Sequence, residues 1–288
     1  MTHNIDKSYI CYFPTLTVLI DDNKEFLDSI VLNLDVNQQS YKSFSNARSA
    51  INFIKSNYLS SQWFQTYINI LEEEKTDCKL VEFNIHDLHQ QMYNKYRFNI
   101  ITTVIADYDM PEINGLDLFL ELKQLNLHKV ILTGAADERL AVNAFNNKLI
   151  DGFISKGSNL VYKELFKSIK LGQNNYFDRI SKNILESYSN DITHSIRNNK
   201  DYIALFNSII KDNHIVEYYM IEEDAKYLLI DRMGQLSIFF IYPEDQLQSF
   251  YQLAEEDNCD SELLLQLKDY KKMVCIDKLH SPLLTVTS

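Results

Sequence analysis

The sequence predicts an α/β fold: a doubly wound parallel sheet of five strands, followed by a small α+β domain with an antiparallel meander. Up to residue 173, short apolar segments rich in β-forming residues alternate with segments whose apolar residues recur at helical spacing. Beyond that point, three β-rich segments follow one another with only short polar breaks between them. The length of 288 residues is enough for two ordinary domains.

The strands expected in the parallel sheet are short segments, most of them apolar, and all but one end at a polar residue or glycine. They are residues 16–21, 39–44, 98–107, 129–134 and 150–156. The third of these is apolar along most of its length, which is typical of a strand buried on both faces. Helices with one apolar face are expected at residues 23–34, 45–57, 115–125, 137–148 and 159–173. This alternation favours one parallel sheet covered by helices on both faces.

An insertion interrupts the alternation at about residues 59–98. A segment of this length is too long for a plain connection between a helix and the next strand. We expect it to be helical, with helices at residues 61–74 and 85–96. Because Trp63 and several tyrosines are costly to leave in water, we expect the insertion to offer a contact surface for a protein.

The C-terminal part, residues 174–288, is predicted to be a separate output or interaction domain, and residues 1–173 the first domain. A helical stretch at residues 176–199 precedes the meander at 215–243. Helices at residues 243–257 and 261–270 follow, and a small sheet of this kind needs helices to cover one of its faces. Its shape allows an analogy with PAS-like ligand sensors, which is an analogy of fold only.

Charge and composition exclude several classes of protein. The net charge is −12, and residues 174–288 carry 11 Lys and Arg against 19 Asp and Glu, so a nucleic-acid partner is not expected. There is no apolar run long enough to cross a membrane and no secretory signal, so we expect a cytoplasmic protein without a membrane partner. The four cysteines form no C-x-x-C pair and are expected to be reduced.

Polar side chains gather where the expected strands end. In a flavodoxin-like sheet of order 2-1-3-4-5, the carboxyl ends of these strands are neighbours, and ligands bind there. Three clustered carboxylates repel one another and need a cation, for which Mg²⁺ is the best match. A carboxylate beside the metal can attack phosphorus, and a lysine can neutralise the charge of the transferred group. The residues at these ends are Asp21, Asp22, Asp107, Asp109, Thr133 and Lys156.

Four motifs resemble the CheY-like receiver domain of two-component response regulators. They are TVLIDDN, VIADYDMPEINGLDLF, VILTG and GFISK, and the resemblance covers residues 15–58 and 98–172. It implies that Asp107 accepts a phosphoryl group from a histidine kinase or a histidine phosphotransfer protein. It also implies Mg²⁺ as the cofactor and no other, and hydrolysis of the acyl phosphate as the reset.

The resemblance also assigns the remaining residues. Asp21 and Asp22 would form the acid pocket, in which Asp22 and the backbone carbonyl of Asp109 help to hold Mg²⁺. The other implied roles are the switch hydroxyl for Thr133, the aromatic ring that changes rotamer for Phe153, and the phosphate contact for Lys156. Two features depart from the family: Gly157 replaces the usual proline, and the insertion makes the distance in sequence from Asp22 to Asp107 much longer.

Three functions are open from the sequence. The first is a phosphorylation switch whose output domain contacts an unknown downstream protein or a second copy in a homodimer. In that case no enzymatic activity is expected beyond self-phosphorylation from a phosphodonor and autodephosphorylation. The second is an enzymatic output acting on a nucleotide or another small molecule, although residues 174–288 show no convergent polar cluster. The third is a degenerate receiver that acts as a constitutive interaction module.

Overall fold

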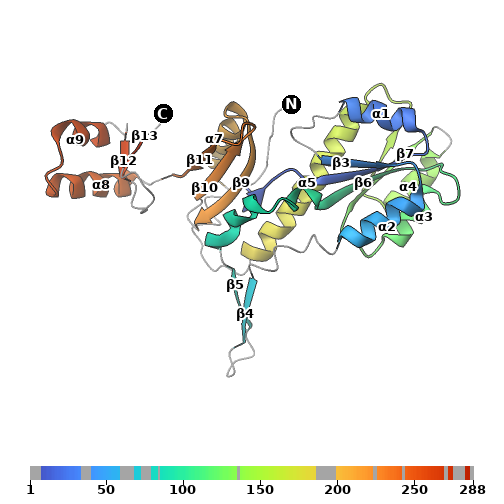
Figure 1. Ribbon diagram of the computed structural model, residues 1–288, viewed down its shortest axis with the longest axis horizontal. Coiled ribbons are helices and arrows are strands. Elements are labelled where there is room, and N and C mark those ends of the chain that lie inside the picture. The colour runs from blue at the N-terminus through green and yellow to red at the C-terminus, as the bar shows by residue number, and fades with distance from the viewer. Residues whose placement is uncertain are drawn as a thin grey trace. The chain divides into compact units, whose positions relative to one another are not determined.

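A computed structural model describes residues 8–33, 40–58, 68–72, 79–83, 85–134, 137–185, 199–222, 226–241, 244–268, 272–274 and 283–285. The chain forms two compact units, Met1–Phe239 and Phe240–Ser288 (Figure 1). Helix α5 (Val161–Leu185) runs without a break through the boundary expected after residue 173. The first unit therefore holds both predicted sheets, and the division into domains at residue 173 stays a prediction.

The parallel sheet has the predicted five strands in the predicted order, β3-β2-β6-β7-β8, which is the flavodoxin-like order. All neighbouring pairs are parallel. The strands are β2 (Leu16–Ile20), β3 (Ser40–Phe44), β6 (Ile101–Asp107), β7 (His128–Thr133) and β8 (Gly152–Ser155). The helices between them are α1 (Lys24–Asn33), α2 (Ala47–Tyr58), α3 (Gly115–Glu121) and α4 (Glu138–Asn146).

Side chains of the central strand point alternately to two cores, as the two-residue period of a strand requires. Ile105 of β6 packs with residues of α1 and α5 on one face. Val104 and Ala106 pack with residues of α2 and α3 on the other. All seven residues of β6 are buried, which explains why its sequence is apolar rather than alternating.

The meander is also confirmed, with one strand that the sequence did not predict. The antiparallel sheet has the order β1-β9-β10-β11. Its strands are β1 (Cys11–Tyr12), β9 (Ile215–Glu222), β10 (Lys226–Asp231) and β11 (Leu236–Phe239), and α7 (Lys200–Asp212) packs on it. Because β1 pairs with β9, the N-terminal segment completes a sheet built from the second half of the chain.

Helix α5 contributes to two of the hydrophobic cores of this unit. Leu165 and Ile169 pack against the parallel sheet. Two turns later, Tyr176, Phe177 and Ile180 pack against β1 and β9. A displacement of α5 relative to one sheet is therefore felt at the other.

The insertion differs from the prediction, because part of it is a β-hairpin rather than a helix. Strands β4 (Ile68–Glu72) and β5 (Lys79–Phe83) pair antiparallel. Apolar residues at alternate positions in Ile-Asn-Ile suit a strand as well as a short helix, and the pairing with a second such segment decides between them. The helix expected at residues 85–96 is instead 3-10 helix, η2 (Ile85–Tyr93), followed by η3 (Arg97–Asn99). Trp63 lies outside the described residues.

Among the described residues, the contacts of the insertion with the antiparallel sheet include a buried side chain and an ion pair. Leu88 of η2 belongs to the same core as β9. The guanidinium of Arg97 donates two hydrogen bonds to the Glu217 carboxylate of β9, at 2.8 and 2.9 Å. Such a two-point contact fixes orientation as well as distance.

The second unit contains the two acidic helices that the sequence predicts, α8 (Glu244–Glu256) and α9 (Ser261–Lys268). It also contains a short antiparallel pair that was not predicted, β12 (Lys272–Val274) with β13 (Leu283–Thr285). Cys11 and Cys259 are free thiols, whereas Cys78 and Cys275 lie outside the described residues. None of the described helices is both long enough and apolar enough to cross a bilayer.

Gly172 allows α5 to lie close to the strands, and this gives a first prediction. A Cβ atom at this position would collide with Thr103 Oγ1 and with the His128 side chain. Gly172→Ala should lower the free energy of unfolding by roughly 1–3 kcal/mol, although alanine is normally the better helix former. Urea unfolding measures this.

Gly152→Ala is the matched control, since no atom lies within 4 Å of a Cβ built there. It should leave stability within about 0.5 kcal/mol of the wild type. A Gly172→Ala variant as stable as the wild type would contradict the close packing of α5.

Candidate functional site

Acidic and basic side chains from three strands meet at the carboxyl edge of the parallel sheet. Asp21 follows β2, Asp107 is the last residue of β6, and Lys156 follows β8. The Lys156 ammonium lies 2.8 Å from Asp21 Oδ2 and 2.8 Å from Asp107 Oδ2. The predicted convergence of residues far apart in the sequence is therefore present.

Asp22 completes a triad of carboxylates. One oxygen from each of Asp21, Asp22 and Asp107 lies within 4.8 Å of the others. Asp21 and Asp107 are buried, while Asp22 is exposed. An all-oxygen set of this kind, open to solvent on one side, fits a hard divalent cation such as Mg²⁺, which binds few carboxylates and keeps some of its water ligands.

The turn after β2 holds the acid pair in place. Asp21 Oδ1 accepts a hydrogen bond from the Asn23 amide at 2.9 Å. Asn23 in turn caps α1, because its side-chain oxygen accepts from the Phe26 amide at 3.1 Å. The backbone amide of Asp21 donates to the Phe44 carbonyl at 3.1 Å. Both ends of the turn are thus fixed by neighbouring elements.

The loop after β6 folds back tightly onto Asp107. The Gly115 amide donates to the Tyr108 carbonyl at 3.0 Å, and Asn114 caps α3 by accepting from the Asp117 amide at 2.9 Å. A Cβ atom at Gly115 would collide with the Asp107 carbonyl oxygen. The Asn-Gly pair is therefore required by the close return of the chain.

Burial shifts the pKa of Asp107, and the contacts between Asp107, Asp21 and Lys156 shift the pKa of Lys156. Burial raises the pKa of Asp107 above its usual value, and the charge of Asp21 adds to this, while Lys156 opposes it. Burial alone would lower the pKa of Lys156, but its bonds to Asp107 and Asp21 outweigh that and raise it. One ammonium therefore balances two buried carboxylates.

The remaining predicted residues lie around this centre. Thr133 ends β7, is buried, and its hydroxyl has no hydrogen-bond partner among the described residues. Its carbonyl accepts the Lys156 amide at 2.9 Å. Phe153 of β8 is 39% exposed, and its ring meets Phe145 of α4 edge-on at 6.4 Å. Asp109 lies in the loop after β6 with an exposed side chain.

One contact at the site was not predicted. The Lys156 ammonium lies over the Phe26 ring, 5.0 Å from its centroid. The ammonium gains a favourable cation–π interaction with the face of this ring. The position of Phe26 in the first turns of the helix after the acid pair is the only signal in the sequence that could have indicated it.

Comparison with known proteins agrees with this geometry. The response regulator LqsR of Legionella pneumophila is 27% identical, with a TM-score of 0.72, over 99% of this chain and 85% of that chain. An adenylate cyclase from Rhodopirellula baltica is 18% identical with a TM-score of 0.41, over 61% of this chain and 99% of that chain. A receiver domain protein from Clostridium thermocellum is 16% identical with a TM-score of 0.38, over 56% of this chain and 95% of that chain.

The last two superpose too poorly to carry an argument. No protein-family model matches the sequence, and no curated protein matches it. The likeness to LqsR, in contrast, runs through the parallel sheet and the antiparallel sheet alike. Since the receiver motifs stand at the strand ends where the acids converge, the chain carries a response-regulator receiver domain, and its fold is similar to that of LqsR over almost its whole length.

Proposed function

We propose that the protein is a phosphorylation switch in which Asp107 accepts a phosphoryl group and alters the contacts of the rest of the chain. The observation that carries the proposal is the convergence of Asp107 with Asp21 and Lys156, whose ammonium lies 2.8 Å from both carboxylates. Carboxylates this close, with one cation between them, are an arrangement typical of phosphoryl transfer to an aspartate.

Asp21, Asp22, Asp107 and the backbone carbonyl of Asp109 would hold Mg²⁺. When bound, the ion would offset the negative charge of the acids and of the incoming phosphoryl oxygens. The fit rests on the three carboxylate oxygens within 4.8 Å of one another.

The chain's own residues supply the rest of the transfer. An Asp107 carboxylate oxygen attacks the phosphorus of a phosphohistidine on the donor, the P–N bond breaks, and its electron pair returns to the imidazole. Lys156 would then move its bond from the carboxylate to a phosphoryl oxygen. The buried Thr133 hydroxyl, which has no partner of its own among the described residues, would donate to another.

We propose a histidine kinase or a histidine phosphotransfer protein as the donor, in keeping with the response-regulator fold. Downstream, the switch would change contacts with another protein or with a second copy of the chain. Helix α5 would transmit the change, because it packs on both sheets. No specific observation favours an enzymatic output or a constitutive interaction module.

A phosphoryl donor of low molecular weight tests the acceptor. With acetyl phosphate and Mg²⁺, the wild type should gain the mass of one phosphoryl group, and peptide mapping should place it on Asp107. Asp107→Asn should abolish the gain. Asp109→Asn should still be phosphorylated, because only the backbone of that residue is assigned a role. Absence of modification in the wild type, or its survival in Asp107→Asn, would refute the acceptor.

The raised pKa of Asp107 gives a stability prediction. An acid whose pKa is raised by folding favours the fold when protonated, and that contribution is lost as the pH rises through its pKa in the folded protein. With a chelator present, Asp107→Asn should therefore be more stable than the wild type at pH 7 by roughly 0.5–2 kcal/mol. The gain should shrink toward pH 4 as the wild-type carboxyl becomes protonated.

Urea unfolding at both pH values measures this difference. Asp117→Asn, at an exposed acid outside the triad, serves as the comparison and should show no such gain. A neutral-pH loss of stability in Asp107→Asn would show that the Lys156 ion pair outweighs burial.

Removal of Mg²⁺ should lower the midpoint of thermal unfolding of the wild type, since an ion bound only to the fold stabilises it. For a chain of this size the shift is roughly 2–4 °C for each kcal/mol of stabilisation. Asp22→Asn should reduce the shift while leaving the metal-free protein nearly unchanged, because Asp22 is exposed. If Mg²⁺ shifts the unfolding midpoint equally in both proteins, Asp22 is not a ligand of the metal.

A further inference from the structure

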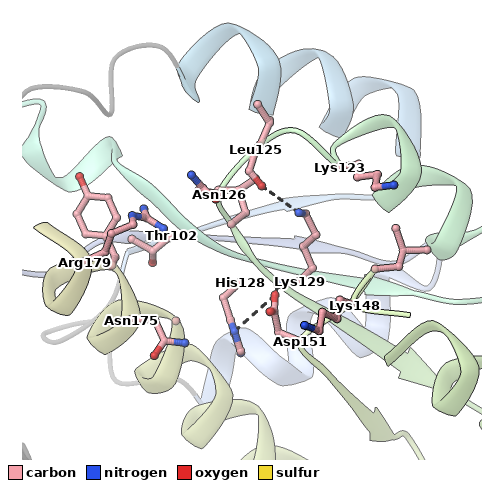
Figure 2. Close-up of a pocket in the computed structure, with 14 residues that line it drawn as sticks. Thr102, Lys123, Leu125, Asn126, His128, Lys129, Lys148, Asp151, Asn175 and Arg179 are labelled. Atoms are coloured by element: carbon pink, nitrogen blue, oxygen red, sulfur yellow. Dashed lines mark hydrogen bonds and ion pairs between the residues drawn. The ribbon is translucent and has the colours of Figure 1, made fainter. Parts of the chain in front are cut away.

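A polar hollow lies at the amino edge of the parallel sheet, the edge opposite the acid site. It has a volume of about 320 Å³. Its walls come from the first residues of β6 and β7, the loop before β7, the loop between α4 and β8, and the middle of α5 (Figure 2). Strand β7 runs six residues from His128 here to Thr133 at the acid edge, a distance of roughly 20 Å. The two sites are therefore separate.

The charge of this hollow is opposite to that of the protein. Four cationic side chains line it, against the single carboxylate of Asp151, in a chain whose net charge is −12. The cations are Lys123, Lys129, Lys148 and Arg179. A concave surface lined by one sign of charge concentrates the field and attracts ligands of the other sign.

The single carboxylate is already engaged by the backbone. Asp151 Oδ2 accepts a hydrogen bond from the Lys129 amide at 2.8 Å. The Lys129 side chain is buried and its ammonium donates to the Leu125 carbonyl at 2.9 Å. Lys129 thus places a poorly hydrated positive charge in the wall of the hollow, where an anion would meet little competition from water.

His128 lies in the wall of the hollow and has one ring nitrogen without a hydrogen bond among the described residues. It is buried, and its Nε2 lies 3.0 Å from Ser168 Oγ. Its Nδ1 is buried without a hydrogen bond, and the nearest acid, Asp151, lies 3.8 Å away. A buried polar atom without a hydrogen bond is rare and asks for an explanation. Figure 2 shows His128 between Asn175 on α5 and Asp151 on the opposite wall.

Lys148 stands in a backbone conformation that favours glycine. It follows α4 with φ 57°, and the Leu149 amide closes the helix end by donating to the Ala144 carbonyl at 3.0 Å. His214 and Asn258 also adopt positive φ, so the conformation alone assigns no function. It does make Lys148→Gly a substitution that removes the charge while suiting the backbone.

We propose that this hollow binds a small phosphomonoester, independently of phosphorylation at Asp107. Lys and Arg are the side chains that recognise a phosphate dianion, and Arg179 can do so with two parallel hydrogen bonds. The volume is at the lower end of small-molecule sites and leaves room for a polar body beside the phosphate. The exposed side chains of Asn126 and Asn175 offer hydrogen bonds to hydroxyl groups on that body.

Such a ligand would join α5 to the sheet. Asn175 and Arg179 belong to α5, whereas Lys123, Lys129 and Lys148 belong to the receiver's strands and loops. The same part of α5 continues into the core of the antiparallel sheet through Tyr176 and Phe177. A bound phosphomonoester would therefore stabilise one position of the helix that both sheets share.

Calorimetric titration of the full chain tests the proposal, at constant ionic strength and with a chelator present. The probes are inorganic phosphate, a hexose phosphate and the same hexose without phosphate. The hexose phosphate should bind the wild type more tightly than inorganic phosphate does, and the hexose alone should not bind. Lys148→Gly and Arg179→Gln should each weaken binding roughly two- to fivefold, and the double variant should multiply the two losses.

Lys211→Gln is the matched control, since it removes an exposed lysine of α7 that does not line the hollow. It should bind as the wild type does. Equal affinity in all variants would place any bound phosphate elsewhere and overturn the site. If inorganic phosphate binds as tightly as the hexose phosphate, the ligand is not a phosphomonoester. If neither anion binds with a millimolar or lower dissociation constant, the proposal as a whole is refuted.

Discussion

The site at the carboxyl edge depends on one ammonium group shared by two buried carboxylates. Asp21 is fully buried and Asp107 is 5% exposed, and each lies 2.8 Å from Lys156 Nζ. Without that cation, two negative charges would stand in a poorly solvated place beside a third. The strand ends, the capped turn at Asn23 and the close return at Gly115 all serve to keep these three groups together. The fold is thus arranged around a charge balance that a phosphoryl group would change.

The second constraint is that α5 packs on two sheets. At its centre, Lys170 donates to the Tyr12 hydroxyl of β1 at 2.6 Å, and Tyr12 donates to Gln173 at 2.9 Å. Burial lowers the pKa of Lys170 to about 7. A polar chain of this kind inside a core must keep its partners to remain stable. It therefore ties the N-terminal segment, α5 and the antiparallel sheet into one unit, Met1–Phe239.

The sequence was informative where local pattern decides the structure. The five parallel strands follow from the alternation of short β-forming segments with helical ones, the meander from three β-rich segments in succession, and the residues gathered around Asp107 from the polar residues at strand ends. Pairing over long distances could not be predicted in the same way. Strand β1 has two residues, and nothing local says that Cys11 pairs with Tyr219. The alternation in Ile68–Glu72 fits strand and helix alike, so the hairpin depends on a partner. The hollow at the amino edge was not predicted, because its lining residues come from separate segments and form no motif in the sequence.

The proposed switch would have to be strong enough to move a helix that packs on two sheets. Turning a state from one per cent to ninety-nine per cent populated requires about 5.5 kcal/mol of differential stabilisation. Hydrogen bonds from Lys156 and from the Thr133 hydroxyl to a phosphoryl oxygen both have a charged acceptor, so each would be worth about 1.5–3 kcal/mol. Together the two bonds reach the required stabilisation only near the top of that range, and Lys156 must give up a carboxylate to make its own. The remainder must come from binding that favours the same position of α5, either by a partner or by a ligand on its other side. A switch of this strength would bias the helix, and a second contact would decide its final state.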